Sequence, residues 1–209
     1  MKLRFVEVSY ERFTRSALTT AEQVELARVD ALAVRLREHL SRCSEEIDAA
    51  HVHQASSGAI QSIVARLLRD ELAFREERIL SPEDGFVTQA RPDFFFRLDD
   101  KRGVLAEVER GGTTTNNHDL KDLWKTHIAP DAQHLFLVVP HANWNEAGEP
   151  RERPYVRVAQ RLGAFFGDPR REIDVVSLHL FGYGRDGKKV LDDEPARGSH
   201  RRNALRERD

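Results

Sequence analysis

Three consecutive phenylalanines, Phe94 to Phe96, constrain the fold of this chain more than any other feature. They lie in a mostly apolar run over residues 92–98, and a second, mostly apolar run, residues 104–109, follows the polar turn at residues 99–103. Successive side chains of a strand point to opposite faces of the sheet, so adjacent large apolar residues need cover on both faces. We therefore predict a β-hairpin placed centrally in a mixed sheet that helices flank, which makes this an α/β protein.

The part of the chain before the hairpin shows helical periodicity. Thr20 and Gln23 have the spacing of a capping box, and apolar residues then recur at helical intervals as far as Leu40. After a polar connection, residues 55–58 offer a second helix start, and Ile60 to Leu72 supply its apolar face. We expect residues 1–73 to be mostly helical.

Several shorter segments have strand or turn composition. Residues 1–10 favour a short strand, because they are rich in β-branched and aromatic side chains. Residues 74–80 and 86–89 favour an antiparallel pair of strands around the turn at residues 81–85. These segments would extend the sheet on the side that precedes the central hairpin.

After the hairpin, the pattern indicates a strand–helix–strand crossover. A helix is expected to start at Asn116 or Asn117, and the continuous apolar run at residues 135–139 predicts a buried strand parallel to the second hairpin arm. A helix over residues 156–166 and a strand over residues 175–181 complete the expected order.

Length and composition set the broad class of the protein. The chain has 209 residues, of which 40% are hydrophobic and 33% charged, as in a globular protein that folds as one domain. No apolar run approaches the roughly 20 residues of a membrane helix, so we expect a cytoplasmic protein that does not bind membranes. One cysteine, Cys43, excludes an internal disulfide and every zinc motif that needs several cysteines. We expect one domain over residues 1–185 and a charged, mobile tail over residues 186–209.

Three acidic residues fall where the predicted hairpin would bring them together. Glu107 and Glu109 share one face of their strand while Val108 points to the other, and Asp93 opens the neighbouring arm. Carboxylates at close range repel each other unless a positive charge compensates them. A divalent metal such as Mg²⁺, which prefers hard oxygen ligands, is the usual compensation.

These residues resemble a known motif. Pro92-Asp93 followed by Glu107-Val108-Glu109 is similar to the PD-(D/E)XK motif of restriction-endonuclease-like nucleases, in the variant of BamHI-type enzymes that has Glu in place of Lys. The resemblance covers residues 56–139, including the helix that opens at residues 55–61 and the segment 111–121. It implies a restriction-endonuclease-like sheet with a catalytic core over residues 56–181.

The resemblance also implies roles for the residues of the motif. Asp93 and Glu107 would bind Mg²⁺, with Mn²⁺ as a substitute, and the carbonyl of Val108 would complete the protein ligands. Glu109 stands where most relatives have lysine, so it would orient the attacking water or bind a second metal. Lys121 and Lys125 share a helix face, and either of them offers a cation in place of the missing lysine.

Other positions are weaker candidates for the same site. Relatives of this kind often carry one more acidic residue on the helix before the hairpin, and among Asp70, Glu71, Glu76 and Glu77 we favour Glu71 as a metal ligand. His118 and His127 are weighed as general bases or phosphate contacts. The pair His51 and His53 has no further zinc ligands nearby and is interpreted as structural.

The resulting functional hypothesis is a Mg²⁺-dependent endonuclease that hydrolyses double-stranded DNA as a homodimer. A sequence-specific type II restriction enzyme is one form of this activity. The net charge of −2 argues against a uniformly basic surface, although arginines crowd the stretch from Arg151 to Arg171. We expect the following residues to contact DNA: Asn116, Asn117, Lys125, Arg151 and Arg153.

Three alternatives remain open. The first is a defence or repair nuclease that acts on modified, branched or single-stranded DNA. The second is a catalytically silent DNA-binding module of the same fold, since Glu109 in place of lysine is also compatible with lost activity. The third is an unrelated α/β domain, in which the carboxylates of Asp93 and Glu107 would lie too far apart to share an ion.

Overall fold

A mixed six-stranded sheet forms the centre of the protein. The computed structural model describes residues 8–76, 91–170 and 173–186. The sheet has the order β1-β8-β5-β4-β3-β2, in which β4, β5 and β8 are parallel and β1, β2 and β3 are antiparallel to their neighbours. Its strands are β1 (Ser9–Thr14), β2 (Arg75–Glu76), β3 (Phe94–Asp99), β4 (Arg102–Val108), β5 (His134–Pro140) and β8 (Ser177–Tyr183).

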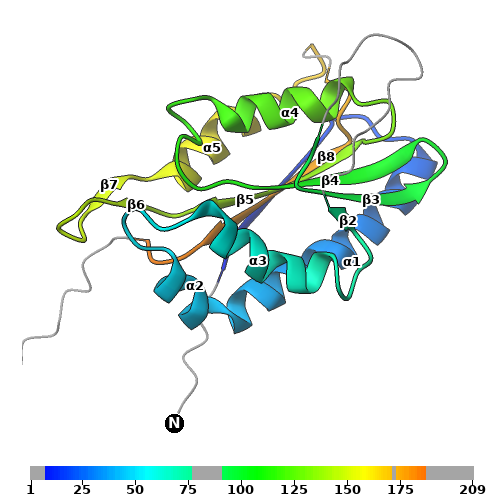
Figure 1. The fold of residues 1–209 in the computed structure, drawn as a ribbon. Helices are drawn as coiled ribbons and strands as arrows, with labels where there is room; N and C mark the ends of the chain where they lie inside the picture. The colour runs from blue at the N-terminus through cyan, green and yellow to red at the C-terminus, as the bar shows by residue number, and fades with distance from the viewer. Residues whose placement is uncertain (1–7, 77–90, 171–172, 187–209) are drawn as a thin grey trace, which may run out of the picture.

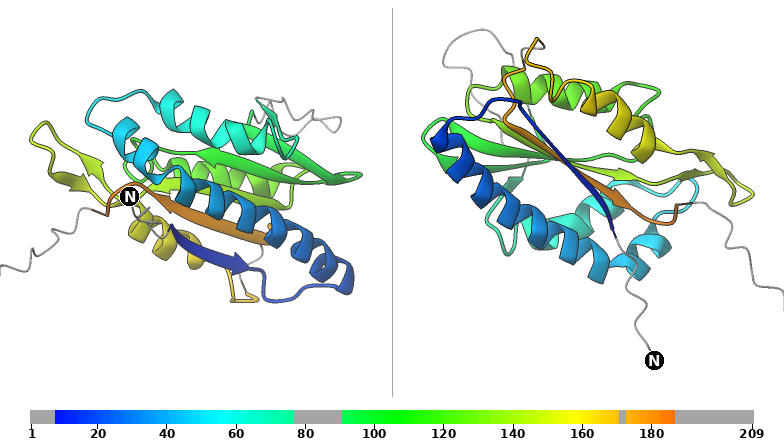
Figure 2. Two further views of the ribbon diagram at one scale, coloured as in Figure 1. Left: turned by 90° about the horizontal axis from the view of Figure 1, so that it is seen from below. Right: turned by 180° about the vertical axis from the view of Figure 1, so that it is seen from behind.

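Helices cover both faces of this sheet, as Figures 1 and 2 show. The helices α1 (Thr20–Arg42), α2 (Ser44–Ala50) and α3 (Ser57–Leu68) pack on one face, where they enclose the first hydrophobic cluster. The helices α4 (His118–Ile128) and α5 (Pro154–Gly163) pack on the other face over a second cluster. The protein therefore has the three-layer α/β/α arrangement that the covered phenylalanines predict.

The central hairpin is confirmed. Strand β3 pairs with β4 on one side and with β2 on the other, so it is not an edge strand. Phe94 belongs to the first hydrophobic cluster and Phe95 to the second, while Phe96 packs against Phe74 on the first side at a ring distance of 5.0 Å. Each face of the sheet thus receives part of the phenylalanine run, as the alternation of a strand requires.

Some boundaries differ from the sequence prediction. The capping box of α1 is made by Thr19 and Glu22, one residue earlier than the predicted pair Thr20 and Gln23. Both pairs have the same spacing, but Thr19 has the extended backbone of an N-cap, whereas Thr20 is already helical, so the oxygen of Thr19 meets the free N–H group. The polar connection before α3 contains the short helix α2, whose Ile47 is buried in the first cluster.

Other predictions fall partly outside the described residues. The first described strand runs from Ser9 to Thr14, later than the predicted residues 1–10. Of the predicted strand at residues 74–80, only β2 at Arg75–Glu76 is described. The predicted turn at 81–85 and strand at 86–89 lie outside the described residues, as do residues 187–209 of the tail.

The carboxyl ends of β4, β5 and β8 lie at one edge of the sheet because these strands are parallel. The loop after β4 leads to α4, and the small hairpin of β6 (Asn143–Trp144) and β7 (Pro150–Glu152) follows β5. Open α/β sheets bind ligands at this edge, where loops from neighbouring strands converge. Within the described ranges, no helix has both the length and the apolar character needed to cross a membrane.

Candidate active site

Backbone hydrogen bonds hold Asp93 and Glu107 next to each other at the end of the β3–β4 hairpin. The N–H of Val108 donates to Asp93 Oδ2 at 2.8 Å, and the N–H of Asp93 donates to Glu107 Oε2 at 3.3 Å. Each carboxylate is therefore tied to the backbone of the opposite arm. The structure thus brings together the two residues on which the metal-site prediction depends.

A lysine from α4 reaches this pair of carboxylates. Lys125 Nζ donates to Glu107 Oε1 at 2.5 Å and to Asp122 Oδ1 at 3.1 Å. Its side chain is 24% exposed and that of Glu107 is 6% exposed, so the ion pair is largely withdrawn from solvent. Of the two lysines that the sequence proposes, Lys125 lies at the site, whereas Lys121 is exposed to solvent one turn earlier.

Glu109 lies one residue beyond the end of β4, and its backbone is fixed on both sides. Its N–H donates to the carbonyl of Val138 at 2.8 Å, and the Tyr183 hydroxyl donates to its carbonyl at 2.9 Å. Its side-chain Oε2 lies 2.9 Å from Nδ1 of His118, the first residue of α4. Val108 packs against the first hydrophobic cluster, as the alternation of the strand predicts.

Burial and mutual repulsion raise the pKa of the carboxyl groups at this site. Burial, followed by the charges of Asp122 and Asp93, raises the pKa of Glu107, although Lys125 opposes the shift. Burial also raises the pKa of Glu109 and of Asp122. For Lys125, burial by itself would lower the pKa, but the charges of Glu107 and Asp122 outweigh it and raise the pKa. The site thus gathers more negative charge than its one lysine balances.

Asp93, Glu107, Glu109 and Asp122 form an acidic cluster, and the donor chemistry of this cluster suits a hard divalent cation. The candidate ligands are carboxylate oxygens and the carbonyl oxygen of Val108, and the buried Oδ2 of Asp122 has no hydrogen-bond partner within the described part of the chain. No group of three or more His, Cys, Asp or Glu side chains among the described residues is, however, already arranged to hold an ion. The ammonium of Lys125 instead binds Oε1 of Glu107.

Other predicted site residues lie elsewhere. Glu71 forms a surface ion pair with Arg35 at 2.9 Å and is about half exposed, so it does not join the acidic cluster. The reason is that Glu71 lies in the turn beyond the end of α3, where its side chain reaches Arg35 on α1. His127 accepts a hydrogen bond from the N–H of Asp174 near the opposite end of α4.

Of the five residues expected to contact DNA, Lys125 lies in the acidic cluster, and the other four form two groups around this edge of the sheet. Asn116 and Asn117 lie in the loop before α4, where Asn117 binds Arg161 through its side-chain oxygen at 2.7 Å. Arg151 and Arg153 lie on and directly after β7. All four side chains are exposed.

Asp122 is the residue of the cluster that the sequence prediction missed. It is 4% exposed and lies one helical turn before Lys125, so both side chains share the face of α4 that meets β4. An acidic residue three positions before a candidate lysine is a signal that could have pointed to it. The same spacing is common on solvated helices, so only the packing of α4 distinguishes the two cases.

The sequence prediction also missed a buried network of hydrogen-bonded polar side chains. Tyr10, His179, Ser177, His134 and Glu25 are linked in this order by hydrogen bonds of 2.7 to 2.9 Å. Ser177 and both histidines are fully buried within the sheet, so no substrate has access to the serine hydroxyl. This hydrogen-bonded network is therefore structural, and it joins β1, β5 and β8 to α1.

Comparison of this chain with protein-family models, with curated proteins and with solved structures found no match.

Proposed function

We propose that this protein is a metal-dependent nuclease that hydrolyses phosphodiester bonds in DNA. The observation that carries the proposal is the meeting of Asp93, Glu107 and Lys125 at the end of the β3–β4 hairpin. Two carboxylates beside a lysine are the groups that a restriction-endonuclease-like nuclease uses for hydrolysis. In this chain, the lysine comes from α4, whereas the strand position that usually supplies it carries Glu109.

The order of elements supports the proposal. Helix α3, the antiparallel strands β2, β3 and β4, helix α4 and the parallel strand β5 follow one another along the chain. This order resembles the core of the PD-(D/E)XK nucleases. We propose that the fold is restriction-endonuclease-like and that residues 56–181 form its catalytic core.

Each residue of the cluster has a proposed role. Asp93, Glu107 and the carbonyl of Val108 would hold Mg²⁺ or Mn²⁺, which supplies an activated water and charge neutralisation when bound. Lys125 would release Glu107 and direct its ammonium at the attacking water or at the phosphate. His118 holds the carboxylate of Glu109, so this pair would orient water and accept its proton. Cleavage of both strands would use two such sites in a homodimer.

Metal-dependent cleavage of plasmid DNA tests the proposal. With Mg²⁺ or Mn²⁺, the natural chain should cleave, and Asp93→Asn and Glu107→Gln should each reduce the rate by at least about 100-fold. Glu71→Gln is the matched control, because this carboxylate lies on the surface in the pair with Arg35. Equal cleavage by all three variants, or cleavage that chelation of the metal leaves unchanged, would contradict the proposal.

One observation favours a second candidate, a DNA-binding module without catalytic activity. Lys125 neutralises Glu107 directly, and the described residues present no ready-made group of metal ligands. The module would bind DNA in the absence of metal and would not cleave it with any divalent cation. Its affinity would be the same after Asp93→Asn, which separates the two candidates in a single series of measurements.

A further inference from the structure

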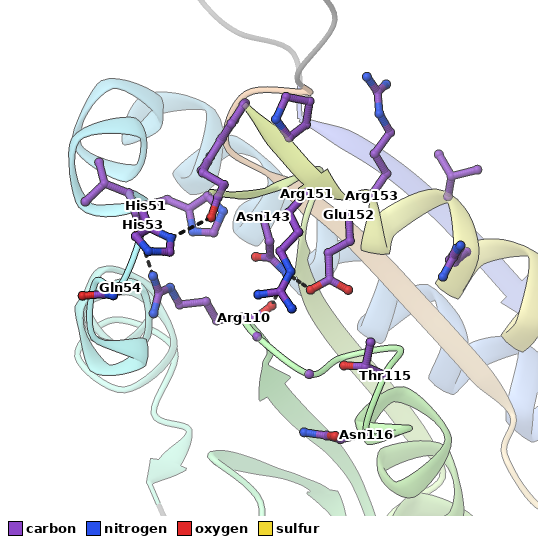
Figure 3. A pocket seen from close by; sticks show the side chains of 17 residues that line it. His51, His53, Gln54, Arg110, Thr115, Asn116, Asn143, Arg151, Glu152 and Arg153 are labelled. Atoms are coloured by element: carbon purple, nitrogen blue, oxygen red, sulfur yellow. Dashed lines mark hydrogen bonds between the residues drawn. The ribbon is translucent and has the colours of Figure 1, made fainter. Parts of the chain in front are cut away.

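A cavity of about 870 Å³ lies beside the acidic cluster at the carboxyl edge of the sheet. Four segments form its walls: residues 51–54 between α2 and α3, residues 110–116 after β4, the β6–β7 hairpin, and the start of α5. Figure 3 shows His51, His53 and Gln54 on one side, Asn143, Arg151 and Glu152 on the other, and Arg110 between them. A volume of this size is that of a small-molecule site.

The cavity begins next to the acidic cluster along the chain. Arg110 and Gly111, which line the cavity, immediately follow Glu109 in the chain. The Tyr183 hydroxyl binds the carbonyl of Glu109, and the His51 ring packs edge-on against Tyr183 at a ring distance of 5.1 Å. Glu109 is thus linked through Tyr183 to the wall of the cavity at His51.

Positive charge dominates the walls. Four arginines line the cavity, against the single carboxylate of Glu152, whose Oε1 accepts a hydrogen bond from Asn143 at 3.0 Å. Arg110 binds the carbonyl of Val52 at 2.7 Å and not a carboxylate. Within the described ranges, Arg151 and Arg157 have no ion-pair partner, so their charges are available to an anionic ligand such as a phosphate.

His51 adds a buried acceptor to these donors. Its Nε2–H donates to the carbonyl of Ala142 at 2.8 Å, which leaves Nδ1 as the acceptor of the neutral ring. Burial lowers the pKa of His51 and so favours this neutral form. Nδ1 is buried and has no hydrogen-bond partner among the described residues, and the same is true of Nε of Arg110. Both atoms have almost no exposed surface, so a ligand in the cavity reaches them only when the surrounding side chains move. A nucleobase offers both a donor and an acceptor on one edge, whereas a phosphate alone accepts hydrogen bonds and donates none.

We propose that this cavity binds one nucleotide that has left the base stack, with its phosphate on the arginines and its base at His51, Arg110 and the amide side chains. The inference rests on the proposed function for the identity of the substrate as a nucleic acid. It adds that the substrate is single-stranded or locally unpaired when it is bound. A base outside the stack costs a few kcal/mol in a duplex, and contacts in such a pocket repay that cost.

Tryptophan fluorescence provides a direct test in the full-length chain. The chain has two tryptophans, of which Trp144 lines the cavity and Trp124 lies on α4 with 61% of its surface exposed. In a Trp124→Phe background, Trp144 alone reports on the cavity. At least one of the four deoxynucleoside 5′-monophosphates should change the emission with saturation, and should bind more tightly than inorganic phosphate or the matching nucleoside.

Two double variants provide the specificity control. Arg151→Ala with Arg157→Ala should weaken binding of the mononucleotide by about tenfold or more. Arg35→Ala with Arg42→Ala removes the same charge from α1, on the other layer of the protein, and should leave the affinity unchanged. An equal effect of both double variants would overturn the proposal. Inorganic phosphate that binds as tightly as every nucleotide would also overturn it, and so would the lack of a saturable signal with all four nucleotides.

The same experiment distinguishes failure of this inference from failure of the proposed function. The Asp93→Asn variant should bind mononucleotides with natural affinity even though it cleaves no DNA. Mononucleotide binding without any cleavage would support the cavity and reject the nuclease. Metal-dependent cleavage without mononucleotide binding would support the nuclease and reject the cavity as a nucleotide site.

Discussion

Lys125 on α4 donates a hydrogen bond of 2.5 Å to Glu107 at the end of β4. The two residues are 18 positions apart in the sequence, and the packing of α4 beside β4 brings them together. The ammonium also binds Asp122, so one cation is shared by two buried carboxylates. This arrangement makes Lys125 the residue on which both the stability and the proposed chemistry of the site depend.

Replacement of Lys125 by methionine should therefore destabilise the protein. We expect the free energy of unfolding to fall by about 1–3 kcal/mol at pH 7, because Glu107 and Asp122 lose their shared cation. Uptake of a proton by these carboxyl groups limits the loss, since their pKa values are already raised. Urea denaturation measures the effect. Lys121→Met, on the exposed face of the same helix, should change the value by less than about 0.5 kcal/mol.

Glu25 should contribute stability that disappears in acid. Burial by itself would raise the pKa of Glu25. The hydrogen bonds from His134 and Arg102 outweigh burial and lower this pKa from its ordinary value of 4.5 to about 2. A lowered pKa in the folded state stabilises the protein above pH 4.5, and this contribution is lost as the pH falls from 4.5 toward 2. After allowance for solvent screening, it amounts to about 1–2 kcal/mol.

The measurement compares Glu25→Gln with the natural chain in urea between pH 3 and pH 7. The difference in unfolding free energy should be largest at neutral pH and should shrink as the pH falls. Glu38→Gln, an exposed position on the same helix, should show no such trend. A difference for Glu25→Gln that is constant with pH would show that its role is packing and not charge.

Gly103 should not tolerate a side chain, because of the close packing inside the hairpin. A Cβ there would lie 2.6 Å from the Phe95 ring and 2.7 Å from the carbonyl oxygen of Phe96. Since the carbonyl belongs to the paired strand, Gly103→Ala should cost about 1–3 kcal/mol and lower the melting temperature. Gly111→Ala is the control, because a Cβ there meets nothing within 4 Å. Equal melting temperatures for the two variants would be inconsistent with this packing.

Two adjacent threonines test the start of α1. Thr19 accepts a hydrogen bond from the N–H of Glu22 and completes a capping box, whereas Thr20 is the first residue of the helix itself. Thr19→Ala should therefore cost about 1 kcal/mol of unfolding free energy. Thr20→Ala should cost much less, and the opposite ranking in chemical denaturation would place the cap where the sequence alone suggested it.

The sheet centre was predictable because its pattern is local. The phenylalanine run, the polar turn and the second apolar run specify a hairpin within about 20 residues, and the apolar segment of β5 specifies its parallel neighbour. Which of Thr19 and Thr20 caps α1 was not predictable, because both threonines have a suitable partner three residues later. The capped residue depends on where the chain leaves β1, which is a tertiary property.

The candidate site divides in the same way. The meeting of Asp93 and Glu107 was predictable from the sequence, since a hairpin and the two-residue period of its strands are enough to align them. Three features depend on the packing of the elements: Lys125 and Asp122 join this pair, Glu71 binds Arg35 at the surface, and an arginine-lined cavity lies beside the cluster. These contacts depend on how a helix rotates and packs against the sheet, and a helical pattern specifies its apolar face but not the partner that this face meets.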